Sequence, residues 1–442
     1  MVSAYSLYLC AKGVMKLLVL GSGGREHALA WKLAESSLCE KLYVAPGNAG
    51  TATVGENIDI SPSDFQAVRD AVLRNQIQMV IVGPEQPLVE GIRDFFLTDP
   101  SLQHVALIGP SGEASRLEGS KAYAKSFMEE YGIPTAAYRS FTHDESYEAV
   151  EFIRSLTPPV VVKADGLAAG KGVLICEHHA EAEQALKEMW AGKFGSAGER
   201  VVIEEFLEGR EFSVFVLTDG KDWQLLPVAK DYKRVGEGDT GPNTGGMGCI
   251  SPVPFVDELM MEKVKSAVID PTLQGIRERK LDYQGFLFFG LIEVNGDPFV
   301  IEYNCRLGDP ETEVILPRLK NDLLSLLIAL VKGKLDHVQT EELPDHAAAV
   351  IVVSGGYPGS YEKGKSISQL DKVTDCLVFH AGTRREEGQV LTNGGRVIAL
   401  TALSDSLEEA VQRARSAAGI VEYEGKVFRR DIGSDLLHTF ER

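Results

Sequence analysis

Four short apolar runs, each ending in a glycine- or proline-rich loop, set the fold of the first quarter of the chain. The runs begin at Leu17, Lys41, Met79 and Val105, and their loops read GSGG, PGNAGT, GPEQP and GPS. Strong helix formers with helical apolar spacing, from Ala28 to Leu33, follow the first loop. This rhythm predicts an open α/β sheet whose strand ends offer their loops to one crevice. We therefore expect a Rossmann-like N-terminal domain over residues 15–116.

The first loop does not match a dinucleotide-binding fingerprint. In the spacing GxGxxG the third glycine position is Glu26, and the second strand ends in PGNAGT instead of an acid that could hold a ribose. A nicotinamide cofactor is therefore not expected. A glycine turn before a helix still forms an anion site, because free backbone N–H groups point outward there. Arg25 and His27 are either contacts to a phosphate or sugar, or a surface arginine and a satisfied histidine.

Length and charge limit the class of protein. A chain of 442 residues is too long for one hydrophobic core, so we expect two to four domains. The formal net charge of −19 argues against a nucleic-acid partner. An anionic small molecule would need local lysines, arginines and helix N-termini.

Cysteine usage and hydropathy indicate a cytoplasmic protein with no membrane partner. The six cysteines are scattered without zinc-site or CxxC spacing, so we expect neither a zinc site nor a disulfide framework. No apolar run reaches the roughly 18 residues of a membrane helix, and residues 323–331 are too few. Residues 1–14 make a poor signal peptide, and we expect a short extension or a misassigned start there.

The most chemically informative stretch is FVIEYNCRLGDPETE, Phe299–Glu313. It opens as an apolar strand, on which Glu302 and Asn304 point the same way because side chains alternate faces. A carboxylate and an amide oxygen on one strand face form a pair of hard-oxygen donors suited to Mg²⁺. The alternative is a solvated turn after an edge strand.

A second stretch, PVVVKADGLAAGKGVLICE (Pro159–Glu177), predicts a glycine-rich β-hairpin. Lys163 ends its first strand and Lys171 lies at the turn, where lysines neutralise phosphates that the glycine backbone can approach. It is not a Walker A loop, because it is one residue short and Gly172 replaces the Ser/Thr that would hold Mg²⁺. A lid over a nucleotide is the prediction. A plain hairpin with solvent-exposed lysines is the alternative.

Two neighbouring segments add candidate nucleotide contacts. A helix predicted after Ser120 carries Lys121 and Lys125 one turn apart, either to face a phosphate or to solubilise the helix. Downstream, the backbone of residues 205–207 could pair with a purine edge. Glu204 or Glu211 could accept from ribose hydroxyls or hold the lid, although paired acids at strand ends usually lie on the surface.

The remaining segments complete the domain plan. Residues 229–252 form a long glycine-dense loop, which is typical of a functional segment. Glu293, on the first strand of a hairpin over residues 285–304, is a candidate further metal ligand. After about residue 336, short strands with glycine turns and an amphipathic helix over 406–421 predict a small α+β C-terminal domain.

Taken together, the hairpin lysines, the strand-end carboxylate and the Glu-x-Asn pair resemble the ATP-grasp fold. The motifs GSGGREHALAWKL, APGNAGT, VGPEQPLVEG, LEGSKAYAK, KADGLAAGKGV, VIEEFLEG, GPNTGGMG, IEYNCRLGDPET, VSGGYPG and TNGGRV resemble the phosphoribosylamine–glycine ligase family. The resemblance runs from Met15 to about Gly433, and GPNTGGMG and NCRLGDPET are its most specific motifs. It implies an ATP-grasp domain over 117–335 with a lid subdomain at about 138–207, and a C-terminal domain over 336–442.

The resemblance also implies a reaction. The carboxylate of glycine attacks the γ-phosphate of ATP to give glycyl phosphate, and the amine of 5-phosphoribosylamine then displaces phosphate. The products are glycinamide ribonucleotide, ADP and phosphate, in purine biosynthesis. Mg²⁺ or Mn²⁺ is the expected metal, glycine and 5-phosphoribosylamine are the expected partners, and we expect a monomer, with a dimer as the alternative. The chemistry needs charge neutralisation more than a protein nucleophile.

Roles carried over from the family fall into three sets. Metal ligands and nucleotide contacts are Glu302, Asn304, Lys121, Lys163, Lys171, Glu204, Glu205, Phe206, Leu207 and, for the ribose, Glu211. The junction of the two substrates is expected at Pro242, Asn243, Thr244, Gly245, Gly246, Arg306, Gly308 and Asp309, with Arg306 and Asp309 as catalytic residues. Contacts to the phosphoribosyl group are expected from Gly23, Gly24, Arg25, Glu26, Asn48, Gly50 and Thr51.

One departure and three rival readings stay open. The family commonly reads QDHKR where this chain has KDYKR, so the roles of Lys230 and Tyr232 are unassigned. A rival is another ATP-grasp ligase, such as a purine-pathway carboxylase or a biotin carboxylase-like enzyme. Further rivals are a nicotinamide-dependent oxidoreductase and a non-catalytic nucleotide sensor.

Overall fold

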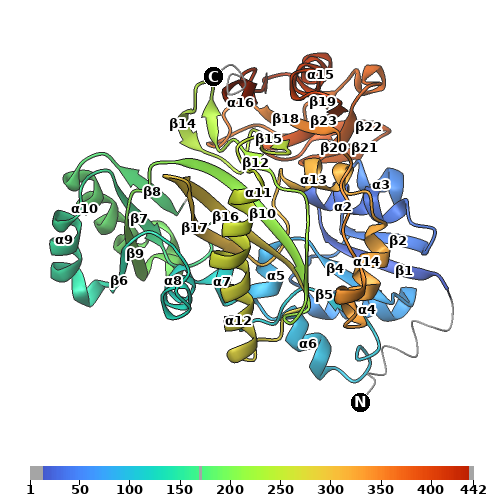
Figure 1. Cartoon of the computed structure of the whole chain (residues 1–442). Helices are drawn as coiled ribbons and strands as arrows, with labels where there is room; N and C mark the ends of the chain where they lie inside the picture. Colours follow the sequence, from blue (N-terminus) through green and yellow to red (C-terminus); the bar gives the residue numbers. More distant parts are fainter. Residues whose placement is uncertain (1–12, 169–171, 438–442) are drawn as a thin grey trace.

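The computed structural model describes residues 13–168 and 172–437. Figure 1 shows three regions around a central antiparallel sheet: the N-terminal α/β region, a separate small sheet on the opposite side, and the C-terminal region above. The multidomain α/β and α+β fold class is therefore confirmed.

The N-terminal region is an open parallel sheet in the order β3-β2-β1-β4-β5. Its strands are β1 (Met15–Gly21), β2 (Cys39–Pro46), β3 (Glu56–Asn57), β4 (Met79–Val82) and β5 (Ala106–Ile108). Its helices are α2 (Gly24–Ala34), α3 (Thr51–Val54), α4 (Phe65–Asn75), α5 (Glu85–Val89) and α6 (Ile92–Thr98). The side chains of β1 are buried on both faces, as a covered parallel sheet requires. The predicted Rossmann-like arrangement is present.

Two antiparallel sheets follow. The first has the order β6-β9-β7-β8 and comprises β6 (Tyr138–Thr142), β7 (Val160–Ala164), β8 (Val173–Cys176) and β9 (Arg200–Glu205), with α9 (Ser146–Ser155) and α10 (His179–Glu188). It has a hydrophobic core of its own, which includes Phe141, Ile153 and Leu186. Strands β7 and β8 pair as the predicted hairpin. Lys171, expected at the hairpin turn, lies outside the described residues.

The second antiparallel sheet is the central one, in the order β11-β10-β16-β17. Its strands are β10 (Arg210–Thr218), β11 (Trp223–Leu225), β16 (Gly285–Val294) and β17 (Asp297–Asn304). Helices α7 (Arg116–Gly119), α8 (Lys121–Glu130), α11 (Glu258–Val264) and α12 (Asp270–Glu278) belong to the same stretch of chain, and α13 (Thr312–Arg318) and α14 (Leu323–Val331) follow it. Glu302 and Asn304 lie at the end of β17.

The C-terminal region is a six-stranded sheet covered by α15 (Leu407–Ile420). Strands β18 (His346–Ser354), β20 (Leu377–His380), β23 (Arg396–Ser404) and β24 (Lys426–Val427) belong to it, and β19 (Ser366–Ile367), β21 (Thr383–Glu386) and β22 (Gln389–Thr392) form a second small sheet. The short helix α16 (Ser434–Leu437) follows.

The segment 229–252 differs from the irregular loop that its glycine content predicts. It contains β12 (Lys230–Asp231), β13 (Arg234–Gly236), β14 (Thr240–Asn243) and β15 (Gly248–Ser251). Strand β15 pairs with β18, with Gly248 opposite Val350, and β12 pairs with β15. The central stretch of chain therefore lends two strands to the C-terminal sheet, because the apolar residues of β15 are buried there.

Two expected absences can be compared with the described residues. None of their helices combines the length and the apolar character that crossing a membrane requires, and α14 is only nine residues long. The five cysteines in the described ranges are all free.

Candidate active site

The predicted metal pair is brought together at the end of β17. The amide nitrogen of Asn304 donates to the carboxylate of Glu302 at 3.3 Å, and both side chains line the same cavity as Lys121 and Lys163. A carboxylate and an amide beside lysines suit a divalent cation that takes its other ligands from phosphate and water. Within residues 13–168 and 172–437, no group of three His, Cys, Asp or Glu side chains could hold a metal ion.

Glu293 is not brought to this pair. In the β16–β17 ladder Gly290 lies opposite Glu302, whereas Glu293 lies opposite Pro298, further along the strand. The carboxylate of Glu293 instead bonds the Nε of Arg210 at 2.8 Å. The hypothesis of a further metal ligand at Glu293 is therefore wrong.

Three lysines surround the nucleotide end of the cavity. Glu204, which is buried, accepts from the Nζ atoms of Lys163 at 2.9 Å and Lys125 at 3.1 Å. Burial lowers the pKa of Lys125 to about 8, although Glu204 opposes the shift. Burial acts to raise the pKa of Glu204, but the two lysines bring it below its usual value. Lys121 donates to the carbonyl of Gly166 at 3.1 Å.

Two lysines on one carboxylate leave an excess of positive charge beside the cavity, which suits the phosphates of a nucleotide. Lys125 is therefore a buried cavity residue, whereas the sequence left a phosphate contact and a solubilising surface lysine as alternatives for it. The signal was present, since Lys121 and Lys125 are one turn apart, but a surface lysine has the same spacing. The side chain of Glu204 pairs with these two lysines. A contact between the backbone of Glu204 and adenine stays a prediction.

The segment predicted to contact the edge of a purine lines the larger of the two cavities, whose volume is about 480 Å³. Glu205, Phe206 and Leu207 follow one another at the end of β9 and line this cavity. Glu205 accepts from the backbone N–H of Ala137 at 2.8 Å. Glu211 also lines the cavity and accepts from Lys233 at 2.6 Å, and this lysine lowers the pKa of Glu211.

The predicted substrate residues divide into those that line this cavity and those that support its walls. Seven line it: Arg25, Asn243, Thr244, Gly245, Arg306, Gly308 and Asp309. Eight do not: Gly23, Gly24, Glu26, Asn48, Gly50, Thr51, Pro242 and Gly246. Six of the eight residues predicted at the junction of the two substrates therefore line one cavity. Their roles stay predictions, as do the phosphoribosyl contacts from the N-terminal loops.

The residues at the start of α2 explain this division. The carboxylate of Glu26 accepts hydrogen bonds from the Nε of Arg25 and from the backbone N–H of Gly23, both at 2.6 Å. Asn48 donates to the carbonyls of Ser22 and His380 at 2.9 and 2.7 Å. These side chains hold the loops in shape, and Arg25 alone of the three reaches the cavity.

His27 is a satisfied histidine and not a contact at the cavity, the second of the two interpretations that the sequence allowed. Its Nδ1 accepts from the backbone N–H of His380 at 2.8 Å, and burial lowers the pKa of its imidazole to about 3. The neutral ring therefore ties α2 to β20 and does not line either cavity described here.

Arg306 lines both cavities and is held by a residue that the sequence did not single out. Its Nη2 lies 2.7 Å from the carboxylate of Glu118, which also accepts from the backbone N–H of Cys305 at 2.7 Å. Burial raises the pKa of Glu118 to about 7, with Arg306 opposing the shift. Glu85 lies 3.4 Å from the Nε of Arg306 and also lines both cavities.

Arg396, from β23, is another cavity residue that the sequence did not single out. Its Nη2 lies 2.8 Å from the carboxylate of Asp309, and it lines the larger cavity although it comes from the C-terminal region. The motif TNGGRV contains this arginine, but nothing local indicates where it points. Lys230 and Tyr232 point elsewhere, with both bonded to Asp435 of α16.

Family comparisons agree over almost the whole described chain. The phosphoribosylglycinamide synthetase N domain matches residues 15–118, its ATP-grasp (A) domain matches residues 119–312, and its C domain matches residues 347–435. The phosphoribosylamine–glycine ligase of Vibrio cholerae is 48% identical over 425 residues, which are 95% of this chain and 98% of that protein.

The chain is similar to solved structures at both moderate and low sequence identity. The phosphoribosylamine–glycine ligase of Thermotoga maritima superposes with a TM-score of 0.82 at 37% identity and covers 94% of this chain and 99% of its own. The biotin carboxylase domain of the Hydrogenobacter thermophilus 2-oxoglutarate carboxylase has a TM-score of 0.70 at 18% identity, covers 98% and 99%, and shares the fold alone. With all three domains matched in order and nearly half of the residues identical to a relative, the chain belongs to the phosphoribosylglycinamide synthetase family, whose central domain is an ATP-grasp domain.

Proposed function

We propose that this chain joins glycine to 5-phosphoribosylamine with the use of ATP, and that it releases glycinamide ribonucleotide, ADP and phosphate. One observation carries the proposal. A single cavity runs from the purine edge at Phe206 and Leu207, past Glu302 and Asn304, to the polar residues Asp309 and Arg396. A nucleotide and a second, anionic substrate can therefore meet in one cavity, within a chain of this family.

The first step is phosphoryl transfer. A carboxylate oxygen of glycine attacks the γ-phosphorus of ATP, the bond from that phosphorus to the β–γ bridging oxygen breaks, and ADP leaves. Lys121, Lys125 and Lys163 hold positive charge beside the place where negative charge is redistributed. A divalent cation, which we propose to be Mg²⁺ or Mn²⁺, supplies further charge neutralisation when held by Glu302 and Asn304.

The second step is acyl transfer. The amine of 5-phosphoribosylamine attacks the carbonyl carbon of glycyl phosphate, the bond from that carbon to the phosphate oxygen breaks, and phosphate leaves as the nitrogen loses a proton. Arg306 lies between the two cavities, where it can hold the phosphoryl group while the bond breaks. No nucleophilic side chain is required, and burial raises the pKa of the nearest thiol, that of Cys305, away from reactivity.

The same arrangement favours this ligase over a carboxylase. The substrate end of the cavity is lined by Asn243, Thr244 and Gly245 of GPNTGGMG and by Gly308 and Asp309 of NCRLGDPET. These are the two most specific motifs of the family, and both contribute residues to the lining of this cavity. We also place the reaction in the cytoplasm and infer a monomer as the working form.

The test is ADP release by the purified chain with Mg-ATP, with glycine and freshly made 5-phosphoribosylamine added singly and together. The proposal expects ADP only when both are present, with an equal amount of glycinamide ribonucleotide. Release of ADP with bicarbonate in their place would favour a carboxylase on the same fold. No release of ADP under any of these conditions would favour a nucleotide sensor.

A further inference from the structure

The loop GPNTGGMG is held from outside its own domain at Gly245. The backbone N–H of Gly245 donates to the hydroxyl oxygen of Tyr357 at 2.9 Å, and the carbonyl oxygen of Gly245 accepts from Arg396. Both partners come from the C-terminal region. The backbone of one loop residue is therefore bound at both its N–H and its carbonyl by residues more than 100 positions away in the sequence.

Arg396 also binds the second specific loop. Its Nη1 donates to the carbonyl of Asp309 at 2.7 Å, and its Nη2 lies 2.8 Å from the Asp309 carboxylate. The other oxygen of that carboxylate accepts from the backbone N–H of Arg25 at 3.4 Å. Asp309 therefore joins the start of α2, its own loop and the C-terminal region at one point.

The guanidinium of Arg396 packs closely against Gly245. A Cβ placed on Gly245 would lie 2.9 Å from the Cζ of Arg396, so a larger residue there would require the guanidinium to shift. Glycine leaves room for the guanidinium beside the backbone. The motif GPNTGGMG and the arginine of TNGGRV are therefore parts of one contact.

We propose that Arg396, assisted by Tyr357, is a positioning residue that fixes the substrate end of the cavity by holding the Gly245 and Asp309 loops together. This inference rests on the proposed function and assigns to the C-terminal region a specific share of it. A rigid wall keeps the second substrate in place, since small displacements of binding groups have large costs. The nucleotide end depends on other elements and is expected to be unaffected.

The test measures two affinities on the full-length chain. Glycinamide ribonucleotide, the stable product, and ADP with Mg²⁺ are each titrated calorimetrically into the wild type, Arg396→Lys and Tyr357→Phe. We expect Arg396→Lys to weaken product binding about tenfold or more, because lysine cannot make the forked contact. Tyr357→Phe should weaken it about threefold, by losing one neutral hydrogen bond. ADP affinity should change less than twofold in both.

Two matched variants separate positioning from general damage. Arg318 is a buried arginine that bonds Ser251 and the carbonyl of Asp345 and lines neither cavity described above. Tyr423 has a buried hydroxyl without a partner in the described part of the chain. Arg318→Lys and Tyr423→Phe are expected to keep the ratio of the two affinities, whatever they do to the melting temperature.

Each contrary result overturns the inference. Unchanged product binding in Arg396→Lys, equal weakening of ADP and product, or the same selective loss in Arg318→Lys would show that Arg396 does not position the substrate end. A wild-type chain that binds ADP but not glycinamide ribonucleotide would overturn the proposed function as well, and that result is distinguishable because it needs no variant.

Discussion

The two ends of the cavity are built in different ways. At the nucleotide end, Lys163 and Glu204 lie on paired strands of one sheet, and Glu302 and Asn304 lie together on a single strand of the central sheet. At the substrate end, Arg25, Gly245, Asp309 and Arg396 come from three regions of the chain. The nucleotide end therefore depends on local strand geometry, whereas the substrate end depends on how the regions dock.

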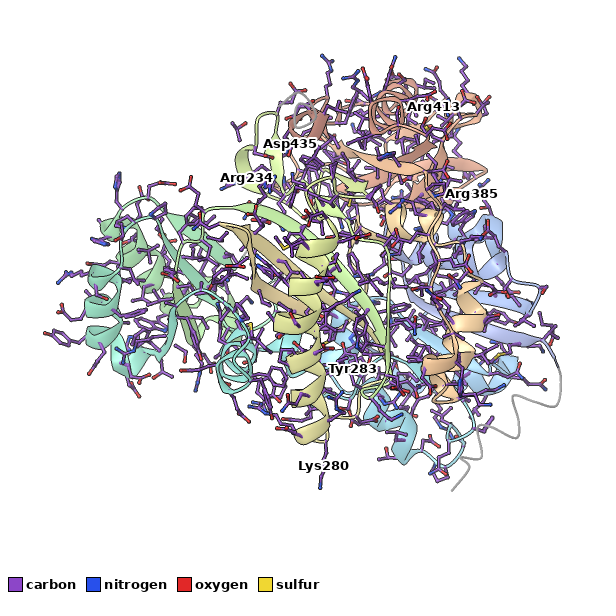
Figure 2. All side chains as sticks on the ribbon, viewed as in Figure 1. Arg234, Lys280, Tyr283, Arg385, Arg413 and Asp435 are labelled. Atoms are coloured by element: carbon purple, nitrogen blue, oxygen red, sulfur yellow. The ribbon has the colours of Figure 1, made fainter. Side chains whose placement is uncertain are left out.

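The β13–β14 hairpin, which precedes the Gly245 loop, is also held by contacts from another region of the chain. Figure 2 labels Arg234, which begins β13 of the β13–β14 hairpin. Arg429, which is buried, donates to the carbonyl of Arg234 at 3.0 Å and to the carboxylate of Asp239 at 2.7 Å. The hairpin beside the substrate loop is thus also held by the C-terminal region. Changes at the nucleotide end should act on catalysis directly, and changes at the substrate end should act through docking.

The largest expected effect is at the nucleotide end. Glu302→Gln should lower turnover by about a thousandfold or more, because it removes the charged oxygen donor for the divalent cation. The side chain of Glu302 is exposed, so the melting temperature should stay unchanged. Steady-state ADP release and thermal unfolding measure the two quantities.

Glu293→Gln is the matched control, since this acid lies on the adjacent strand and pairs with Arg210. It should retain wild-type turnover. Wild-type activity in Glu302→Gln would contradict the metal assignment, and loss of activity in Glu293→Gln would restore the rejected ligand.

The second largest effect is expected on the pH dependence of stability, through Glu118, which pairs with Arg306. The pKa of Glu118 is about 7 in the folded chain against an ordinary 4.5, so the folded state holds the proton more tightly. Its contribution to stability is full below pH 4.5 and is lost as the pH rises through 7. The loss is about 3 kcal/mol of unfolding free energy. Urea unfolding at several pH values should show this extra decline in the wild type and not in Glu118→Gln.

Glu113→Gln serves as the control, because Glu113 is an exposed acid near α7. Its pH dependence should match that of the wild type. Parallel curves for the wild type and Glu118→Gln would mean that Glu118 is charged throughout this range, and the burial argument would fail.

A smaller effect is expected from Lys125. Lys125→Met removes one of the two lysines on Glu204 and should raise the KM for ATP about tenfold to hundredfold, with the KM for glycine nearly unchanged. Lys187→Met, at an exposed position on α10, should change neither constant. An unaltered ATP KM in Lys125→Met would make this lysine a structural partner of Glu204 only.

The smallest effect is expected from Glu211. Glu211→Gln keeps the shape of the side chain and loses its charge toward Lys233 and a ribose, so the KM for ATP should rise about fivefold. Stability should hardly change, because the pair is exposed. A change in the KM for 5-phosphoribosylamine without a change for ATP would move Glu211 to the other end of the cavity.

The strand and hairpin geometry of the nucleotide end could be predicted from the sequence because its signals are local. The period of two along a strand places Glu302 beside Asn304, and an apolar–glycine–apolar pattern predicts the β7–β8 hairpin. Lys125 was left open because a buried and an exposed lysine have the same helical spacing. Glu293 was misplaced because the register of a bulged ladder cannot be counted from one strand.

The substrate end was predicted as a set of motifs but not as a structure. The pairing of Gly248 with Val350 joins strands about 100 residues apart, and no local pattern specifies it. Arg396 and Glu118 belong to recognised motifs, but their partners lie on other regions of the chain. Polar networks that form only on docking are therefore visible in the folded structure alone.

The most direct test of the account follows one oxygen atom. Glycine labelled with ¹⁸O in its carboxylate is converted by the chain with ATP and 5-phosphoribosylamine, and the released phosphate is analysed by mass spectrometry. If glycyl phosphate forms and the amine then displaces phosphate, each phosphate carries one oxygen from glycine. Phosphate without the label would contradict the two-step reaction in this cavity.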